Sequence, residues 1–304
     1  MRALTVEPGR PGSLRVESVR EPVSDPDEDE LLVAGRAVGV CGTDKEIVRG
    51  EYGVAPAGGS RMVLGHESLG RVIEAPAGSS FAAGDLVVGV VRRPDPVPCG
   101  ACAHGEWDMC RNGRYRERGI KELDGYASEL WSVPAEYAVR VDATLGLAGV
   151  LVEPASVVAK AWEQVERIGA RAWFEPERVM VTGAGPIGLL AALLGVQRGL
   201  EVHVLDRVTG GRKPDLVRGL GATYHHGTVA EAAAQAPPDV VIEATGAGQV
   251  VIDVMRESSH YGIVCLTGLS TAGRTLPMDA GALNREIVLD NDVVVGSVNA
   301  NLGH

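Results

Sequence analysis

Val179-Met-Val-Thr-Gly-Ala-Gly-Pro-Ile-Gly188 is the stretch that decides the fold of the second half of this 304-residue chain. It carries Gly183-x-Gly185-x-x-Gly188 between a strand-like apolar run and the helix-like residues Ile187–Arg198. The first glycine permits a tight turn, the second lets a pyrophosphate approach the backbone, and the third lets the helix pack closely on the sheet. The amide groups at the N-terminus of such a helix face negative phosphates. The stretch therefore predicts a dinucleotide-binding βαβ unit.

The residues after this loop bear on the choice of dinucleotide. Asp206 ends the next expected strand, eighteen residues after Gly188, where an acid would bind the ribose 2′-hydroxyl and favour NAD⁺. Arg207, together with Arg212 and Lys213, could instead pair with a 2′-phosphate, or could form an ordinary solvated loop. We therefore expect NAD(P)⁺ as cofactor with no firm preference. The expected contacts are Gly183, Gly185, Pro186, Ile187, Gly188, Asp206 and Arg207.

Strand-like and helix-like segments alternate throughout the second half of the chain. Strands are expected at Val179–Thr182, Val202–Asp206, Val240–Thr245, Ile263–Gly268 and Val293–Val298, and helices at Ile187–Arg198, Asp215–Leu220, Val229–Gln235 and Val250–Ser258. Alternating units of this length imply a doubly wound parallel sheet. His304 follows the last expected strand closely, although such a sheet normally has a further covering helix. We therefore expect the C-terminal portion to be truncated, or the chain to be a short member of its class.

The first half has a different pattern. Short β-segments such as Leu31–Val40, Gly70–Ile73 and Leu86–Val91 are separated by Gly and Pro, which is typical of a compact antiparallel barrel. Pro154–Ile168 is expected to be a helix that begins at its proline. The prediction is an α/β fold with a mostly-β domain and connecting helix over residues 1–176 and a nucleotide-binding domain over residues 177–304.

Composition excludes several classes of protein. The chain has 29 basic and 40 acidic residues and no basic patch, so a nucleic-acid partner is not expected. No secretory signal follows Met1, and the longest clean apolar run, Ile187–Val196, is about half a membrane span. We therefore expect a cytoplasmic protein with no membrane partner. The five cysteines, an odd count, favour metal or catalytic use over disulfides.

Four residues of the first half have side chains suited to zinc. Cys41 lies in Gly39-Val-Cys-Gly-Thr-Asp44, His66 and Glu67 in Leu64-Gly-His-Glu67, and Glu153 in Leu151-Val-Glu-Pro154. Thiolate, imidazole and carboxylate all bind zinc, and a catalytic site needs three protein ligands and an open position. Singly, Cys41 would be a core residue and Glu67 a paired carboxylate. Together they predict a catalytic Zn²⁺.

Two of these motifs carry a family resemblance. Gly65-His-Glu-x-x-Gly70 and Cys41-Gly-Thr-Asp44 resemble the zinc signatures of zinc-dependent medium-chain alcohol dehydrogenases, and the Gly183 loop follows at that family's spacing. Four further stretches resemble the family's glucose dehydrogenases, although many relatives carry His where this chain has Glu46. They are Thr43-Asp-Lys-Glu-Ile47, Gly50-Glu-Tyr-Gly53, Leu151-Val-Glu-Pro-Ala-Ser-Val-Val158 and Gly296-Ser-Val-Asn-Ala-Asn301.

The resemblance implies a fold and a set of roles. The fold is a GroES-like catalytic domain followed by a Rossmann domain. Cys41, His66 and Glu67 would surround the zinc, with Glu153 as a ligand directly or through water. Glu117 and Asn301, with Thr43 and Glu153, would bind a sugar. Thr43 could also relay the hydroxyl proton or merely satisfy the loop backbone, and Glu117 could instead be a surface carboxylate beside Arg116 and Arg118.

The expected reaction oxidises an aldose, in the first place D-glucose at its anomeric carbon to the lactone. Zinc would stabilise the substrate alkoxide, and hydride would pass to the nicotinamide. One alternative is a polyol or amino-alcohol dehydrogenase of the same family. Another is a truncated, inactive nucleotide-binding homologue. A homo-oligomer, dimer or tetramer, is also expected.

A second cysteine group, Cys99-x2-Cys102-x7-Cys110, resembles the family's structural-zinc lobe. The usual form has a fourth cysteine three residues before the first of these, where this chain has Pro96, which has no ligating side chain. Structural zinc sites are normally closed by four ligands. Either Asp95 or His104 supplies the fourth ligand, or the lobe is free of metal.

Overall fold

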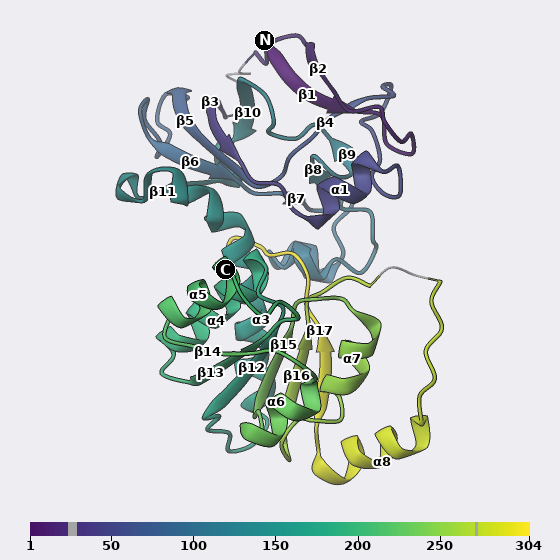
Figure 1. Cartoon of the computed structure of the whole chain (residues 1–304). Helices are drawn as coiled ribbons and strands as arrows, with labels where there is room; N and C mark the ends of the chain where they lie inside the picture. Colours follow the sequence, from purple (N-terminus) through teal and green to yellow (C-terminus); the bar gives the residue numbers. More distant parts are fainter. Residues whose placement is uncertain (24–28, 271–272) are drawn as a thin grey trace. The chain divides into compact units, whose positions relative to one another are not determined.

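The computed structural model describes residues 1–23, 29–270 and 273–304, which form two compact units (Figure 1). The first unit comprises Met1–Glu153 with Ala300–His304, and the second comprises Pro154–Asn299. The α/β fold class predicted from the sequence is confirmed, with a mostly-β GroES-like first unit and a Rossmann-like parallel sheet in the second.

The first unit contains three small sheets. One has the antiparallel order β2 (Arg15–Ser18), β1 (Arg2–Val6), β4 (Met62–Val63). The central sheet, antiparallel throughout, has the order β10 (Leu130–Pro134), β3 (Glu30–Val38), β5 (Ser68–Glu74), β6 (Leu86–Gly89), β11 (Ala138–Val141). The third joins β7 (Arg92–Arg93), β8 (Arg116–Arg118) and β9 (Glu122–Leu123). Helical pieces are α1 (Gly42–Val48), α2 (Gly100–Ala103) and the 3₁₀ turns η2 (Trp107–Met109), η3 (Ala135–Tyr137) and η4 (Ala143–Leu151).

The central sheet closes over an apolar core because alternate residues of its strands face inward. Val33, Val72 and Trp131 are buried together there. Gly70 has no room for a side chain, since a Cβ would lie 2.4 Å from Val33 Cγ1 and 2.7 Å from Trp131 Cζ2. This core holds in place the strand ends and loops from which the candidate site is built.

The second unit is a six-stranded parallel sheet with the order β14 (Thr223–His225), β13 (Glu201–Leu205), β12 (Arg178–Thr182), β15 (Val240–Glu243), β16 (Ile263–Leu266), β17 (Val293–Gly296). Its helices are α4 (Pro186–Gln197), α5 (Arg212–Gly219), α6 (Val229–Gln235), α7 (Gly248–Val254) and α8 (Ala280–Asp290), with most of α3 (Val152–Gly169). Numbered from β12, the order is 3-2-1-4-5-6, that of a dinucleotide-binding sheet.

Successive side chains of β12 alternate between two apolar cores of the second unit. Val179 and Val181 pack in one core with α3 and α4, whereas Met180 packs in the other with α6 and α7. Burial on both faces explains why these strands are continuous apolar runs in the sequence.

The compact units divide elsewhere than at residue 176, the boundary expected from the sequence. The helix expected as part of the first domain is α3, and from Pro154 onward it belongs to the second unit. The reason is packing, because Val158, Trp162 and Val165 of α3 lie in the core of the second unit.

One helical segment, Ala143–Gly169, is long and apolar enough by composition to cross a membrane. It is two pieces, since Gly146 in η4 has the non-helical angles φ 51° and ψ −130°. Its second piece packs Val158, Ala161, Trp162 and Val165 into a protein core, as core helices do. Such a segment is weak support for a membrane span, and the absence of a membrane partner stays a prediction.

Candidate functional site

Cys41 lies at the start of α1, where the local sequence orients its sulfur. It is the N-cap residue in extended conformation, and its Sγ accepts a hydrogen bond from Thr43 N at 3.3 Å. Asp44 Oδ2 accepts one from Cys41 N at 2.9 Å, which completes a capping box. Cys41 Sγ thereby lies 3.0 Å from His66 Nε2, although the two residues come from different segments of the first unit.

Asp44 is a residue of this site that the sequence analysis did not assign. Its Oδ1 lies 3.4 Å from His66 Nδ1, both groups are buried, and neither atom has a hydrogen-bond partner within the described part of the chain. A carboxylate behind the second nitrogen of an imidazole is the arrangement that orients metal-binding histidines. The signal was present, since Asp44 lies three residues after Cys41 at capping-box spacing.

Glu67 and Glu153 complete the group of donors. One ligand atom each from His66, Glu67 and Glu153 can be chosen so that all lie within 4.8 Å of one another, and the same holds for Cys41, Asp44 and His66. Glu67 fits only because residue 39 is glycine, since a Cβ there would lie 1.8 Å from Glu67 Oε2.

The electrostatics of this group favour a bound cation. Burial raises the pKa of Glu67, and it raises the pKa of Glu153 to about 7. Burial alone would lower the pKa of His66, but the neighbouring Asp44 carboxylate and Cys41 thiol raise it well above its ordinary value. The raised pKa values of Glu67 and Glu153 reflect their burial beside other acidic groups. The sulfur, imidazole and carboxylate donors gathered here fit a zinc ion.

Thr43 contributes its backbone N–H to the Cys41 sulfur, as described above. The proton-relay role of its hydroxyl stays a prediction.

Glu117 is not the surface carboxylate that the sequence left open as an alternative. It is buried, with 4% of its surface exposed, and its Oε1 accepts a hydrogen bond from Arg92 Nε at 3.0 Å and lies 2.9 Å from Arg92 Nη2 in an ion pair. Arg92 lies opposite Glu117 on the neighbouring strand, and its Nη1 also donates to Asp108 O at 3.0 Å. The charge of Glu117 acts with burial to raise the pKa of Tyr52.

Asn301 joins the same network from the other end of the chain. Its Nδ2 donates to Asp108 Oδ1 at 2.7 Å. Asp108 thus connects Asn301 with Arg92, the partner of Glu117. The two residues predicted to bind a sugar are therefore held by one buried polar network in the first unit, and neither Arg92 nor Asp108 was identified from the sequence.

The Gly-rich loop of the second unit has the geometry that its sequence predicts. Gly183 has φ +95°, a conformation that favours glycine. A Cβ on Gly188 would lie 1.7 Å from Gly183 O, so only glycine lets α4 begin so close to the strand. Gly185, the N-cap of α4, faces open space, with no atom within 4 Å of a built Cβ. The loop thus leaves its second glycine accessible to a phosphate.

This loop borders a cavity of about 520 Å³ whose lining includes Gly185, Asp206, Arg207 and Lys213. Asp206 Oδ2 accepts hydrogen bonds from Ala184 N and Lys213 Nζ, both at 2.7 Å. Burial alone would raise the pKa of Asp206, but the hydrogen bonds from Lys213 and Ala184 keep it below its ordinary value. The cavity therefore presents the Asp206 carboxylate with the Lys213 ammonium in direct contact with it.

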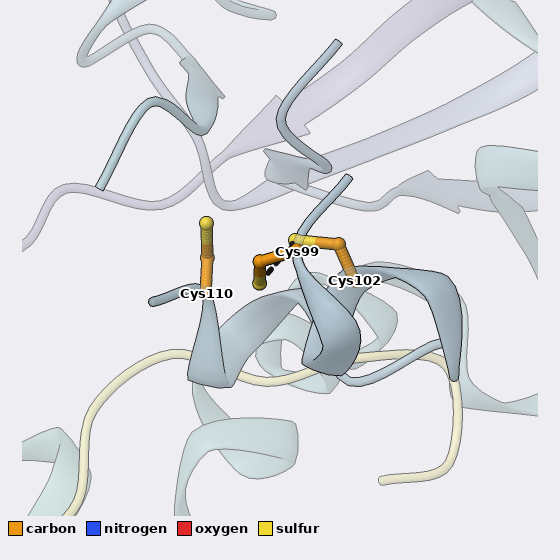
Figure 2. Close-up of side chains that lie close together, drawn as sticks. All are labelled: Cys99, Cys102 and Cys110. Atoms are coloured by element: carbon orange, nitrogen blue, oxygen red, sulfur yellow. Dashed lines mark hydrogen bonds between the residues drawn. The ribbon is translucent and has the colours of Figure 1, made fainter. Parts of the chain in front are cut away.

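Three cysteine sulfurs converge in the second cysteine group (Figure 2). Neither expected fourth ligand joins them. Asp95 accepts hydrogen bonds from Val97 N, Asn112 Nδ2 and Arg114 Nε, so both its oxygens are engaged. His104 Nδ1 instead lies 2.7 Å from Gly100 O at an exposed position. Among the described residues the metal-ligating group contains only Cys99, Cys102 and Cys110, which does not fit a closed structural zinc site.

Comparison with known proteins gives consistent matches over the chain. The family profile described as "Glucose dehydrogenase C-terminus" matches residues 146–304, and that described as "Alcohol dehydrogenase GroES-like domain" matches residues 27–143. The chain is 41% identical to glucose 1-dehydrogenase of Methanocella arvoryzae, covering 100% of this chain and 86% of that protein. It is 40% identical to glucose 1-dehydrogenase 2 of Vulcanisaeta moutnovskia, with 100% and 85% covered.

A solved structure is similar over the whole chain. Haloferax mediterranei glucose dehydrogenase, in complex with NADP, Zn and gluconolactone, superposes with a TM-score of 0.91 at 33% identity. The match covers 100% of this chain and 86% of that one. The expectation of a truncated C-terminal portion stays a prediction.

Proposed function

Since the chain belongs to the zinc-dependent medium-chain alcohol dehydrogenases, in their glucose dehydrogenase branch, we propose that it oxidises an aldose with NAD(P)⁺. The favoured substrate is D-glucose, oxidised at its anomeric carbon to the lactone. The observation that carries this proposal is the presence, in one unit, of a metal-donor group and of a buried polar network that ends in Glu117 and Asn301.

The residues of the first unit would divide the work as follows. Cys41, His66 and Glu67 hold the zinc, with Glu153 as a ligand directly or through water. A bound zinc ion supplies Lewis acidity, which lowers the pKa of a hydroxyl group attached to it. Asp44 orients His66 from behind, and Thr43 takes the hydroxyl proton toward solvent.

The sugar would be recognised by directional polar groups. Glu117 accepts a hydrogen bond from a sugar hydroxyl while Arg92 keeps its carboxylate in place. Asn301 offers its side-chain amide from a position held by Asp108. A polyhydroxylated substrate needs such donors and acceptors, whereas a simple alcohol does not.

The cofactor would be held by the second unit. Gly185 and the N-terminus of α4 receive the pyrophosphate. Asp206 receives an adenosine ribose, and Lys213 and Arg207 can compensate a 2′-phosphate. We propose use of both NAD⁺ and NADP⁺ on this ground.

The test combines metal analysis with turnover. The purified protein should contain tightly bound zinc and should reduce NAD(P)⁺ when glucose is added. His66→Ala should lose the zinc and almost all turnover, whereas His260→Ala, at an exposed position of the second unit, should keep both. A zinc-loaded protein that oxidises polyols or amino alcohols but not aldoses would favour the related dehydrogenase. A protein that binds NAD(P)⁺ and oxidises none of them would favour an inactive homologue.

We also propose a cytoplasmic location and a homo-oligomer. All five cysteines are free thiols, which suits a reducing compartment. Light scattering on the purified protein would give the oligomer.

A further inference from the structure

The three sulfurs of Cys99, Cys102 and Cys110 are close enough to share one ion (Figure 2). Their ligand atoms all lie within 4.8 Å of one another, and Cys99 Sγ lies 3.7 Å from Cys102 Sγ. Two thiolates bound to one ion at about 2.3 Å lie about 3.8 Å apart in tetrahedral geometry. A disulfide would need about 2.05 Å and therefore a movement of both side chains. At this distance the Cys99 thiol donates a hydrogen bond to Cys102 Sγ, and the spacing also suits a shared ion but not a disulfide.

The protein holds this arrangement by contacts that need no metal. Cys99 is the N-cap of α2, Cys102 lies within α2, and Cys110 directly follows η2. Arg111 N donates to Cys99 Sγ at 3.3 Å. A backbone bond ties the two helical pieces, with Glu106 N at the start of η2 donating to Ala101 O in α2 at 2.9 Å. The sulfur positions are thus set by the local backbone.

The segment is also anchored to the rest of the first unit. Trp107 in η2 is buried and meets Tyr137 edge to face at a centroid distance of 5.9 Å. Asp95 is buried, and its Oδ2 accepts a hydrogen bond at 2.9 Å from Nδ2 of Asn112, two residues after Cys110. Arg92 holds the carbonyl of Asp108. These contacts already hold the segment in place without a metal. A structural zinc ion is therefore not needed to fold it.

The donor set itself argues against zinc. Pro96 occupies the position of the fourth cysteine, and the oxygens of Asp95 are engaged elsewhere. Zinc in structural sites is almost always held by four ligands. Soft thiolates select Cu(I) as well as zinc and iron–sulfur clusters. Among these, Cu(I) is the single ion that commonly takes three sulfur ligands and no fourth.

We propose that Cys99, Cys102 and Cys110 form a three-sulfur site for the soft monovalent cation Cu(I). Each thiol releases its proton to solvent as its sulfur binds the ion, and no atom changes oxidation state. The site is separate from the zinc donors at Cys41 and His66, which include nitrogen and oxygen. The proposal therefore stands or falls independently of the proposed oxidation of a sugar.

The experiment uses the zinc-loaded protein under anaerobic conditions. Cu(I) is supplied by a chromophoric chelator, and its transfer to the protein is followed by the loss of the chelator's colour. One Cu(I) should bind per chain while the zinc content stays unchanged, and X-ray absorption should show three sulfur neighbours. Cys110→Ser should weaken binding by at least about 100-fold, since changes outside the ligand set already cost 10- to 100-fold.

The matched control is Cys265→Ser, because Cys265 is fully buried in β16 and outside the cluster. It should leave the Cu(I) affinity unchanged. Equal affinity of Cys110→Ser and the parent would overturn the proposal, as would a copper spectrum with fewer than three sulfurs. A second zinc per chain that resists chelation would also overturn it, since the lobe would then be a closed zinc site.

Discussion

Breaking the buried pair of Arg92 and Glu117 tests whether the network serves the substrate, the fold or both. Glu117→Gln keeps the size of the side chain and removes its charge. A hydrogen bond to a charged group contributes about 1.5–3 kcal/mol. If Glu117 contacts a sugar hydroxyl, kcat/KM for aldoses should fall on the order of 10- to 100-fold. Small simple alcohols lack that hydroxyl and should be little affected, and the zinc content should not change.

Arg92→Met should act mainly on stability. Both side chains of the pair are at most 7% exposed, so the variant removes the arginine partner of a buried carboxylate. Removal of one partner of a buried pair costs about 3–5 kcal/mol. Amide exchange in β7 and β8, followed by mass spectrometry, should then be about 100- to 4,000-fold faster. The double variant Arg92→Met/Glu117→Gln should recover part of this loss of stability, since neither residue of the pair then carries a charge.

Arg140→Met is the matched control, because Arg140 pairs with Asp85 at 2.8 Å but is 52% exposed. Exposed pairs contribute about 0–1 kcal/mol, so this variant should change exchange little. The reasoning is refuted if Arg92→Met costs no more than Arg140→Met. Equal losses of Glu117→Gln on sugars and on simple alcohols would show that Glu117 has a structural role only.

Three further predictions concern the second unit. Gly185→Val should fold normally, since its side chain meets open space, but calorimetry should show weak binding of NAD(P)⁺. Gly188→Ala places its Cβ against the Gly183 carbonyl and should destabilise the unit. A Gly185→Val variant less stable than Gly188→Ala would contradict the assigned roles. Asp206→Ala should raise the kcat/KM for NADP⁺ relative to that for NAD⁺, because it removes a carboxylate and releases Lys213. If this ratio stays the same or falls, Asp206 does not select against the 2′-phosphate. Burial and a neighbouring imidazole lower the pKa of His225, so the unfolded chain takes up this proton at a higher pH than the folded one and stability falls as the pH drops below about 6.5. His225→Gln should flatten this dependence in urea titrations, and an unchanged slope would exclude His225 as its source.

Local sequence determined much of the second unit. Buried parallel strands must be apolar on both faces, and a helix that starts on a phosphate site needs glycine at three fixed positions. Both constraints act within a few residues, so the doubly wound sheet, the loop at Gly183–Gly188 and all strands except β14 could be predicted. Strand β14 (Thr223–His225) was missed because it is a short edge strand without a buried apolar run. Helix α8 was missed, although Asp279 at its N-cap and Asn291 in left-handed conformation at its C-cap are cap residues that could have indicated it.

The candidate zinc donors could also be predicted, since Cys41, His66 and Glu67 lie in short motifs that resemble a family. Their surroundings could not. Arg92 reaches Glu117 only through the pairing of β7 with β8, and Asp108 meets Asn301 only because the last residues of the chain return to the first unit. A buried charged group needs a partner of opposite charge or a hydrogen bond. Because this partner can come from any part of the chain, the sequence alone does not identify it. The sequence by itself determined the kinds of groups in this protein, and the tertiary structure decided which of them meet.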